Sequence, residues 1–139
     1  MKTLEEVVND IQNQNFIYEM AAVGYFGNKN VNEVPQKFKV FVNGAEGSVP
    51  HFHIWDDATN GSEFHTCICI KDVKYFHHTG KEDELNSEQK RKLMEFLKRA
   101  PSNKRYKSHW EYICSMWNDN NPLQPHVNEN SSIPDYTRL

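Results

Sequence analysis

Hydrophobic and polar residues alternate with a period of two in the central part of this chain, and the alternation predicts a small antiparallel sheet. Every second residue is apolar in 37–42. The alternation returns in 51–56 and in 64–70, and the stretch between them is rich in Asp, Asn and Gly, which form turns. We therefore expect strands at 37–42 and 73–78 and a β-hairpin over 51–70.

Three other stretches carry apolar residues at the spacing of an α-helix. The stretch 3–13 begins with a capping-box pattern of Thr3 and Glu6, the second covers 85–100, and the third begins near Ser108. This order of elements predicts an α+β fold: a small antiparallel sheet with an N-terminal helix and two C-terminal helices packed on it.

The size and composition indicate one globular domain. A chain of 139 residues is long enough to bury a core of its own. We expect this domain to cover 1–118, because the composition changes after Asn118. The stretch 119–139 is rich in Asn and Pro and weakly apolar, which predicts an extended or partly disordered tail.

The distribution of apolar residues also bears on the compartment. No apolar run approaches the roughly 20 residues that a membrane helix needs, so we expect no membrane association. The first residues contain no apolar leader. Three cysteines in such a chain are typical of reduced thiols, and we expect a cytoplasmic protein.

The predicted hairpin contains the main candidate functional residues of this sequence, which are histidines and cysteines. With a period of two, His51, His53 and Trp55 share one face of the first strand, and His65, Cys67 and Cys69 share one face of the second. If His53 lies opposite His65, the two sets fall on the same side of the hairpin. The other side is then apolar, with Phe52, Ile54, Phe64, Ile68 and Ile70, and this separation favours the register.

Imidazole and thiolate groups are ligands of zinc and related metals. The hairpin therefore indicates a site for zinc or another divalent transition metal, with His51, His53 and His65 as ligands. Two alternatives stay open. The residues can pack and hydrogen-bond without an ion, or they can line a pocket with Trp55 for an anionic or aromatic ligand.

Two hypotheses of a catalytic function for the same face also stay open. Cys67 or Cys69 could act as a nucleophile activated by His53 or His65. Alternatively, Asp57 or Glu63 in the turn could serve as acid or base beside a metal-activated water.

A second candidate site lies between Lys90 and Lys107. The net charge of the whole chain is −3, but this stretch contains eight basic residues and a single acidic one, Glu95. Such a patch can hold a small anionic ligand or nucleic acid, and a solvated helix face is the alternative. The residues that we expect to contact an anion are Arg91, Arg99 and Arg105.

The order of these features resembles a family of short, uncharacterised bacterial proteins with a Pro-His-Phe-His signature. The stretch Val49-Pro50-His51-Phe52-His53-Ile54 matches the signature, 64–70 resembles the strand that follows, and 85–97 resembles the helix. Either Trp110 or Trp117 corresponds to the closing tryptophan. The chain departs from the family in lacking a second proline before His51. The resemblance implies a bacterial or phage protein encoded near toxin–antitoxin and mobile-element genes.

These observations lead to one main hypothesis and two alternatives. The main hypothesis is a small non-enzymatic binding protein of bacterial or phage conflict, an inhibitor or ligand sponge, whose histidine face binds a small anionic ligand or a protein partner. The first alternative is a metal-dependent hydrolase or nuclease that uses the same histidines. The second is a nucleic-acid-binding component that acts through Lys90–Lys107.

Overall fold

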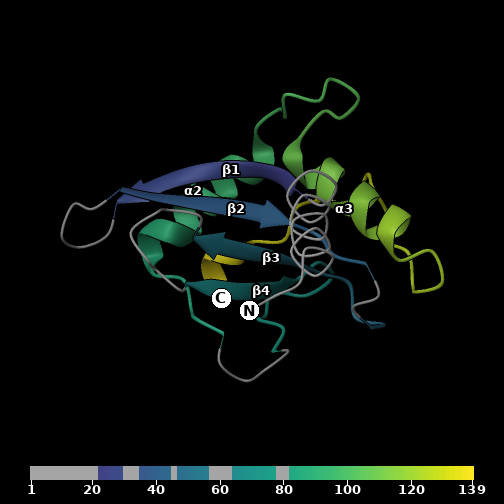
Figure 1. Ribbon diagram of the computed structural model, residues 1–139, viewed down its shortest axis with the longest axis horizontal. Helices are drawn as coiled ribbons and strands as arrows, with labels where there is room; N and C mark the ends of the chain where they lie inside the picture. Colours follow the sequence, from purple (N-terminus) through teal and green to yellow (C-terminus); the bar gives the residue numbers. More distant parts are fainter. Residues whose placement is uncertain (1–21, 30–34, 45–46, 57–63, 78–81) are drawn as a thin grey trace, which may run out of the picture.

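The sheet of this protein is an antiparallel meander in which every strand pairs with its neighbour in the sequence (Figure 1). The computed structural model describes residues 22–29, 35–44, 47–56, 64–77 and 82–139. Within these ranges the sheet has four strands, which are β1 (Ala22–Lys29), β2 (Pro35–Phe41), β3 (His51–Asp56) and β4 (His65–Cys69).

Two α-helices follow the sheet in the sequence and pack on one of its faces (Figure 1). Helix α2 (Ser87–Lys98) begins with a capping box, in which the Gln89 N–H donates to the Asn86 side chain and the Asn86 N–H donates to the Gln89 side chain, both at 2.8 Å. Helix α3 (His109–Asn120) begins at Ser108, whose hydroxyl accepts from the Glu111 N–H.

The predicted layout of one helix before the sheet and two after it is wrong. In the ranges that the structure describes, α2 and α3 are the α-helices, and both are C-terminal. The predicted helix at 3–13 lies outside the described residues. The predicted strand at 73–78 is also wrong for 73–77, where Tyr75 forms a single β-bridge with Ile68. The spacing of apolar residues shows where a helix or strand can form. Tertiary packing supplies most of the stability of a helix, and it therefore decides how the elements are arranged.

The core lies between the sheet and the helices. Its strand residues come from alternate positions that face one way, and its helix residues come from the apolar faces of α2 and α3. Burying these side chains is the main stabilising contribution. The fully buried members include Phe38, Val40, Phe52, Ile54, Ile68, Leu93, Phe96, Leu97, Ile113 and Trp117.

The stretch 119–139 is held against this core. Tyr136, in the short 3-10 helix η1 (Tyr136–Arg138), is fully buried, and its hydroxyl donates to the Cys69 carbonyl at 2.7 Å. Trp117 donates to the Pro125 carbonyl at 2.9 Å. Between α3 and η1 this stretch forms neither helix nor strand. Its anchors are single apolar residues at irregular spacing, which form no periodic signal in the sequence.

Among the described residues, neither α-helix has the length and hydrophobicity needed to cross a bilayer.

Gly24 allows β1 to approach the helices closely. A Cβ atom at this position would lie 2.9 Å from His109 Nε2 and 3.0 Å from Phe96 Cε2. We expect Gly24→Ala to lower the free energy of unfolding by about 1–3 kcal/mol, the usual cost of overpacking a core. Urea denaturation measures this. The matched control is Gly27→Ala at an exposed position of the same strand. Equal stabilities of the two variants would contradict the close contact.

His109 makes the stability depend on pH. Its ring is buried against Phe96, and burial lowers the pKa of His109 below its ordinary value of 6.5. As the pH falls below 6.5, His109 therefore becomes protonated in the unfolded chain while it stays neutral in the folded protein. The free energy of unfolding decreases as a result. We expect His109→Asn, which retains a donor for the Phe96 carbonyl, to lose less stability between about pH 7.5 and about pH 5.5 than the wild type. Identical losses in urea denaturation would show that His109 contributes nothing.

Candidate metal centre

The register of the β3–β4 hairpin brings the histidines and cysteines together. Trp55 pairs with His65, His53 with Cys67, and His51 with Cys69. The predicted pairing of His53 with His65 is therefore wrong by two residues. A slip of two residues keeps every side chain on its own face, so the predicted separation of an apolar face from a His/Cys face is confirmed.

Three side chains on the His/Cys face converge on one point. His53 Nδ1 lies 2.9 Å from His65 Nε2 and 3.2 Å from Cys67 Sγ. The remaining side of the triangle, from Cys67 Sγ to His65 Nε2, measures 3.7 Å. These three atoms are ligand atoms of two metal-binding residue types, histidine and cysteine, and the group could hold a metal ion. We call it the His53/His65/Cys67 centre.

The triangle has nearly the dimensions of a zinc site. Around tetrahedral zinc, bonds of about 2.0–2.1 Å to nitrogen and about 2.3 Å to sulfur place ligand atoms roughly 3.3–3.6 Å apart. The Cys67–His65 distance is close to this range, whereas the two nitrogens are closer together, at 2.9 Å. A bound ion would therefore require the two nitrogens to move apart by a few tenths of an ångström and the two rings to turn until both lone pairs point at the ion.

The two imidazole rings lie almost in one plane. Their planes differ by 5°, and their centroids are 5.2 Å apart. Since the nearest nitrogens are 2.9 Å apart, centroids this far apart require the nitrogens to face each other head-on. This is the geometry of a hydrogen bond in which one nitrogen carries the hydrogen and the other accepts it. A cation at this point would replace that proton.

The centre is largely buried, and its face of the sheet also carries the fully buried Lys39, which pairs with Trp55 and has its Nζ 5.5 Å from the centre of the Phe41 ring. Cys67 is fully buried, and His53 is 4% exposed. The Phe41 ring of β2 is stacked on the His53 ring, with centroids 4.8 Å apart and planes 9° apart. His65 is half-buried. Electrostatic interactions are stronger in such an environment than in water, both between ligands and ion and between the three groups themselves.

Main-chain hydrogen bonds hold the two β4 residues of the centre. The Asp83 N–H donates to the His65 carbonyl at 2.8 Å, and the Asp83 carboxylate accepts from the His65 N–H at 2.9 Å. Two residues further along, the Phe76 N–H donates to the Cys67 carbonyl at 2.9 Å. The segments on either side of residues 78–81 therefore position β4 at both ligand residues.

The predicted site residues of β3 have different places. His53 belongs to the centre, together with His65, but Cys67 provides the third ligand atom and His51 lies outside the group. The His51 ring is stacked on Phe76 with centroids 4.4 Å apart, and its Nδ1 lies 2.7 Å from the Val49 carbonyl. Sequence reasoning considered Cys67 only as a nucleophile. Cys67 lies opposite His53 in the hairpin, so the correct register would have identified it as a ligand residue of the centre.

The three predicted arginines are not part of the centre: Arg91 is in α2, and Arg99 and Arg105 are in the loop between α2 and α3. Arg91 of α2 forms ion pairs with Glu88 and Glu95. Arg99 donates to the Tyr25 carbonyl at 3.2 Å, and Arg105 lies over the Tyr106 ring. Trp55, which is half-buried, pairs with His65 across the strands. The predicted acid or base residues Asp57 and Glu63 lie outside the described residues.

The other two cysteines are poor ligands and poor nucleophiles. Burial raises the pKa of the Cys69 thiol, although the charge of Lys74 acts in the opposite direction. Burial also raises the pKa of Cys114 to about 12. Both thiols therefore stay protonated at neutral pH, and the thiolate is the form that binds metals and attacks substrates.

Neither the protein-family models, nor the curated proteins, nor the solved structures include a match to this chain. The resemblance to the Pro-His-Phe-His family, and the bacterial or phage origin that it implies, therefore stay predictions.

The contact of His51 with Val49 determines the tautomer of this histidine. A carbonyl oxygen only accepts hydrogen bonds, so the neutral His51 ring carries its hydrogen on Nδ1. We expect the Nδ1–H tautomer in a long-range proton–nitrogen correlation spectrum, assigned by comparison with His51→Asn. A neutral ring protonated on Nε2 would contradict the hydrogen bond.

Proposed function

We propose that this protein is a small, non-enzymatic metal-binding protein whose His53, His65 and Cys67 side chains hold a divalent transition metal of the zinc class. The observation that carries the proposal is the convergence of the three ligand atoms, all within 4.8 Å of one another. The residues come from two adjacent strands, and rigid strands position ligands more accurately than loops do.

The donor set favours particular ions. Two imidazole nitrogens and one thiolate suit zinc, and they also suit copper, nickel and iron to differing degrees. They do not suit calcium or magnesium, which prefer oxygen ligands. Zinc is the best fit because it takes nitrogen and sulfur ligands together in tetrahedral sites.

Burial favours binding over catalysis. A catalytic ion must keep a coordination position that substrate and water can reach. Here the thiol is fully buried and His53 is nearly so. A bound ion would therefore stabilise the β3–β4 hairpin or form part of a ligand-binding face. An inhibitor or ligand-sponge role in bacterial or phage conflict remains part of the proposal, and it rests on the family resemblance alone.

The same contacts favour one competing function, that of a thiol enzyme. Cys67 Sγ lies 3.2 Å from His53 Nδ1, the contact of a nucleophile with its base, but His65 Nε2 contacts that same nitrogen rather than the opposite one, where the third group of a catalytic triad binds. This function requires a reactive thiolate and an open path for the substrate, and the burial of Cys67 is the argument against it.

The test compares two cysteines on the same face of the same strand. We expect untagged wild-type protein to bind one equivalent of Zn²⁺, and Co²⁺ to produce a thiolate-to-metal absorption band. Cys67→Ser should lose this band and bind Zn²⁺ more weakly by more than the roughly 10–100-fold that loss of a supporting residue costs. Cys69→Ser should keep the band and the affinity, because Cys69 is outside the centre.

Two results would overturn the proposal. One is the absence of Zn²⁺ and Co²⁺ binding by folded wild-type protein, with the fold checked by circular dichroism. The other is equal loss of binding in the two cysteine variants. Rapid alkylation of Cys67 that added Zn²⁺ does not slow would instead support the thiol enzyme.

A further inference from the structure

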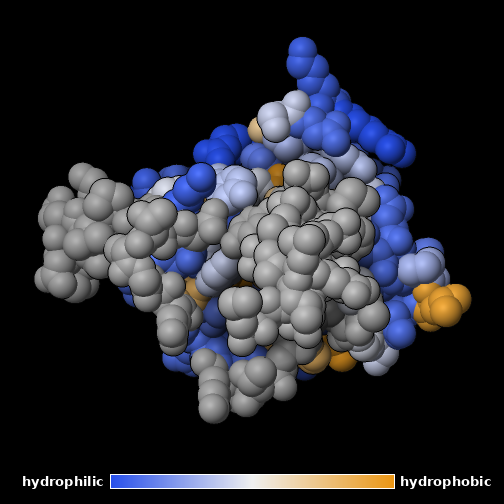
Figure 2. All heavy atoms as spheres, in the orientation of Figure 1, coloured by the Kyte–Doolittle hydropathy of each residue, from blue (hydrophilic) through white to orange (hydrophobic). Residues whose placement is uncertain are grey.

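A strongly basic loop connects α2 to α3. Residues 99–108, which we call the basic loop, contain four cationic residues and no acidic residue. All four are exposed. In Figure 1 the loop projects from the body of the protein at the top of the view, and Figure 2 shows a hydrophilic projection there. The cationic residues are Arg99, Lys104, Arg105 and Lys107.

Hydrogen bonds hold this loop in a defined shape. The His109 N–H donates to the Arg99 carbonyl at 2.9 Å and closes its base. The Asn103 side chain accepts from the Arg105 N–H at 3.1 Å, and the Asn103 carbonyl accepts from the Tyr106 N–H at 3.2 Å. A partner that binds an ordered loop does not have to supply the free energy of ordering it.

Aromatic residues support the cations of the loop. The Tyr106 ring is stacked on Tyr112, with centroids 4.4 Å apart and planes 12° apart, and its hydroxyl contacts Ser115 at 3.1 Å. The Arg105 guanidinium lies 5.8 Å from the centre of the Tyr106 ring. Arg105 is exposed, so the N–H groups of its guanidinium can make two parallel hydrogen bonds to a phosphate.

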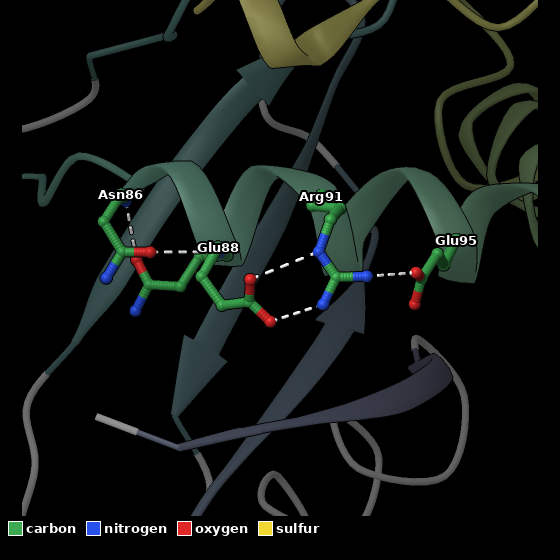
Figure 3. A network of polar contacts seen from close by, with 5 residues as sticks. Asn86, Glu88, Arg91 and Glu95 are labelled. Atoms are coloured by element: carbon green, nitrogen blue, oxygen red, sulfur yellow. Dashed lines mark hydrogen bonds and ion pairs between the residues drawn. The ribbon is translucent and has the colours of Figure 1, made fainter. Parts of the chain in front are cut away.

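The four loop cations differ from Arg91 of α2. Arg91 is bracketed by Glu88 and Glu95, and both carboxylates bind its guanidinium (Figure 3). Within the part of the chain that the structure describes, no ion pair involves any of the four loop cations.

We propose that the basic loop binds the phosphate backbone of nucleic acid. A phosphodiester chain carries a charge at every nucleotide, so several cations on one projecting loop can each meet a phosphate and release a counterion. Asn103, Ser102 and Ser108 add the neutral polar groups that also contact phosphates. The net charge of −3 does not oppose this, because charges further away than about 8 Å are largely screened at physiological salt. The proposal is independent of the metal centre.

The experiment compares two arginines that carry the same charge in different surroundings. Fluorescence anisotropy measures the binding of labelled single-stranded DNA, single-stranded RNA and duplex DNA over a range of salt concentrations. We expect the binding constant of the wild type to fall steeply with salt. Arg105→Gln should reduce the slope of its logarithm by about one, as the loss of one phosphate contact does. Arg91→Gln should leave the slope unchanged, because Glu88 and Glu95 already neutralise Arg91.

A second variant makes the test decisive. Lys104→Gln/Arg105→Gln/Lys107→Gln should lose at least about tenfold in affinity at low salt while its circular dichroism spectrum stays that of the wild type. Stronger binding of the single strands or of the duplex shows which form supplies the phosphates. The proposal is overturned if no nucleic acid binds at low salt, or if Arg91→Gln and Arg105→Gln have equal effects. Binding of polyglutamate as tight as that of nucleic acid would also overturn it, in favour of an acidic protein partner.

Discussion

The antiparallel pairing of β3 with β4 is the constraint on which the rest of the structure depends. Because side chains alternate across a strand, one register sends Phe52, Ile54 and Ile68 to the face that meets the helices. The same register sends His53, His65 and Cys67 to the other face. The burial that stabilises the sheet therefore also assembles the centre, and a slip of one residue would disrupt both. Tyr136 strengthens this arrangement from the C-terminal stretch through its hydrogen bond to the Cys69 carbonyl.

The three side chains of the centre contact one another through the same atoms that could bind a metal ion. His53 and His65 share a proton along a head-on line, and Cys67 approaches the same nitrogen. Replacing that proton and the thiol proton by one divalent ion requires the rings to separate and to turn toward the ion, and it makes the metal affinity depend on pH. Burying polar groups lowers stability unless they form hydrogen bonds or bind an ion. Both the metal-free and the metal-bound state must therefore satisfy all three side chains.

Charge is distributed unevenly over this acidic chain. The helix face of α2 is internally neutralised, with Arg91 between Glu88 and Glu95, whereas the basic loop has no acidic residue of its own. The basic loop connects the two helices, and the His53/His65/Cys67 centre lies on the face of the sheet opposite the one that the helices cover. The two features are therefore separate in the fold.

By itself, the sequence determined the face assignments and the approximate positions of the two C-terminal helices. Alternation identified the His/Cys face, and helical spacing predicted helices over 85–100 and from near Ser108, where the structure has α2 and α3, because periodicity is a local property. Only the tertiary structure decided the register of the hairpin and the position of Tyr136 against β4. It also decided that Cys67, and not His51, belongs to the centre. A register shift of two residues preserves the alternation, so the sequence pattern cannot distinguish His53–His65 pairing from His53–Cys67 pairing. Similarly, an isolated buried residue such as Tyr136 has no periodic neighbours, and contacts with residues distant in the sequence decide where it packs.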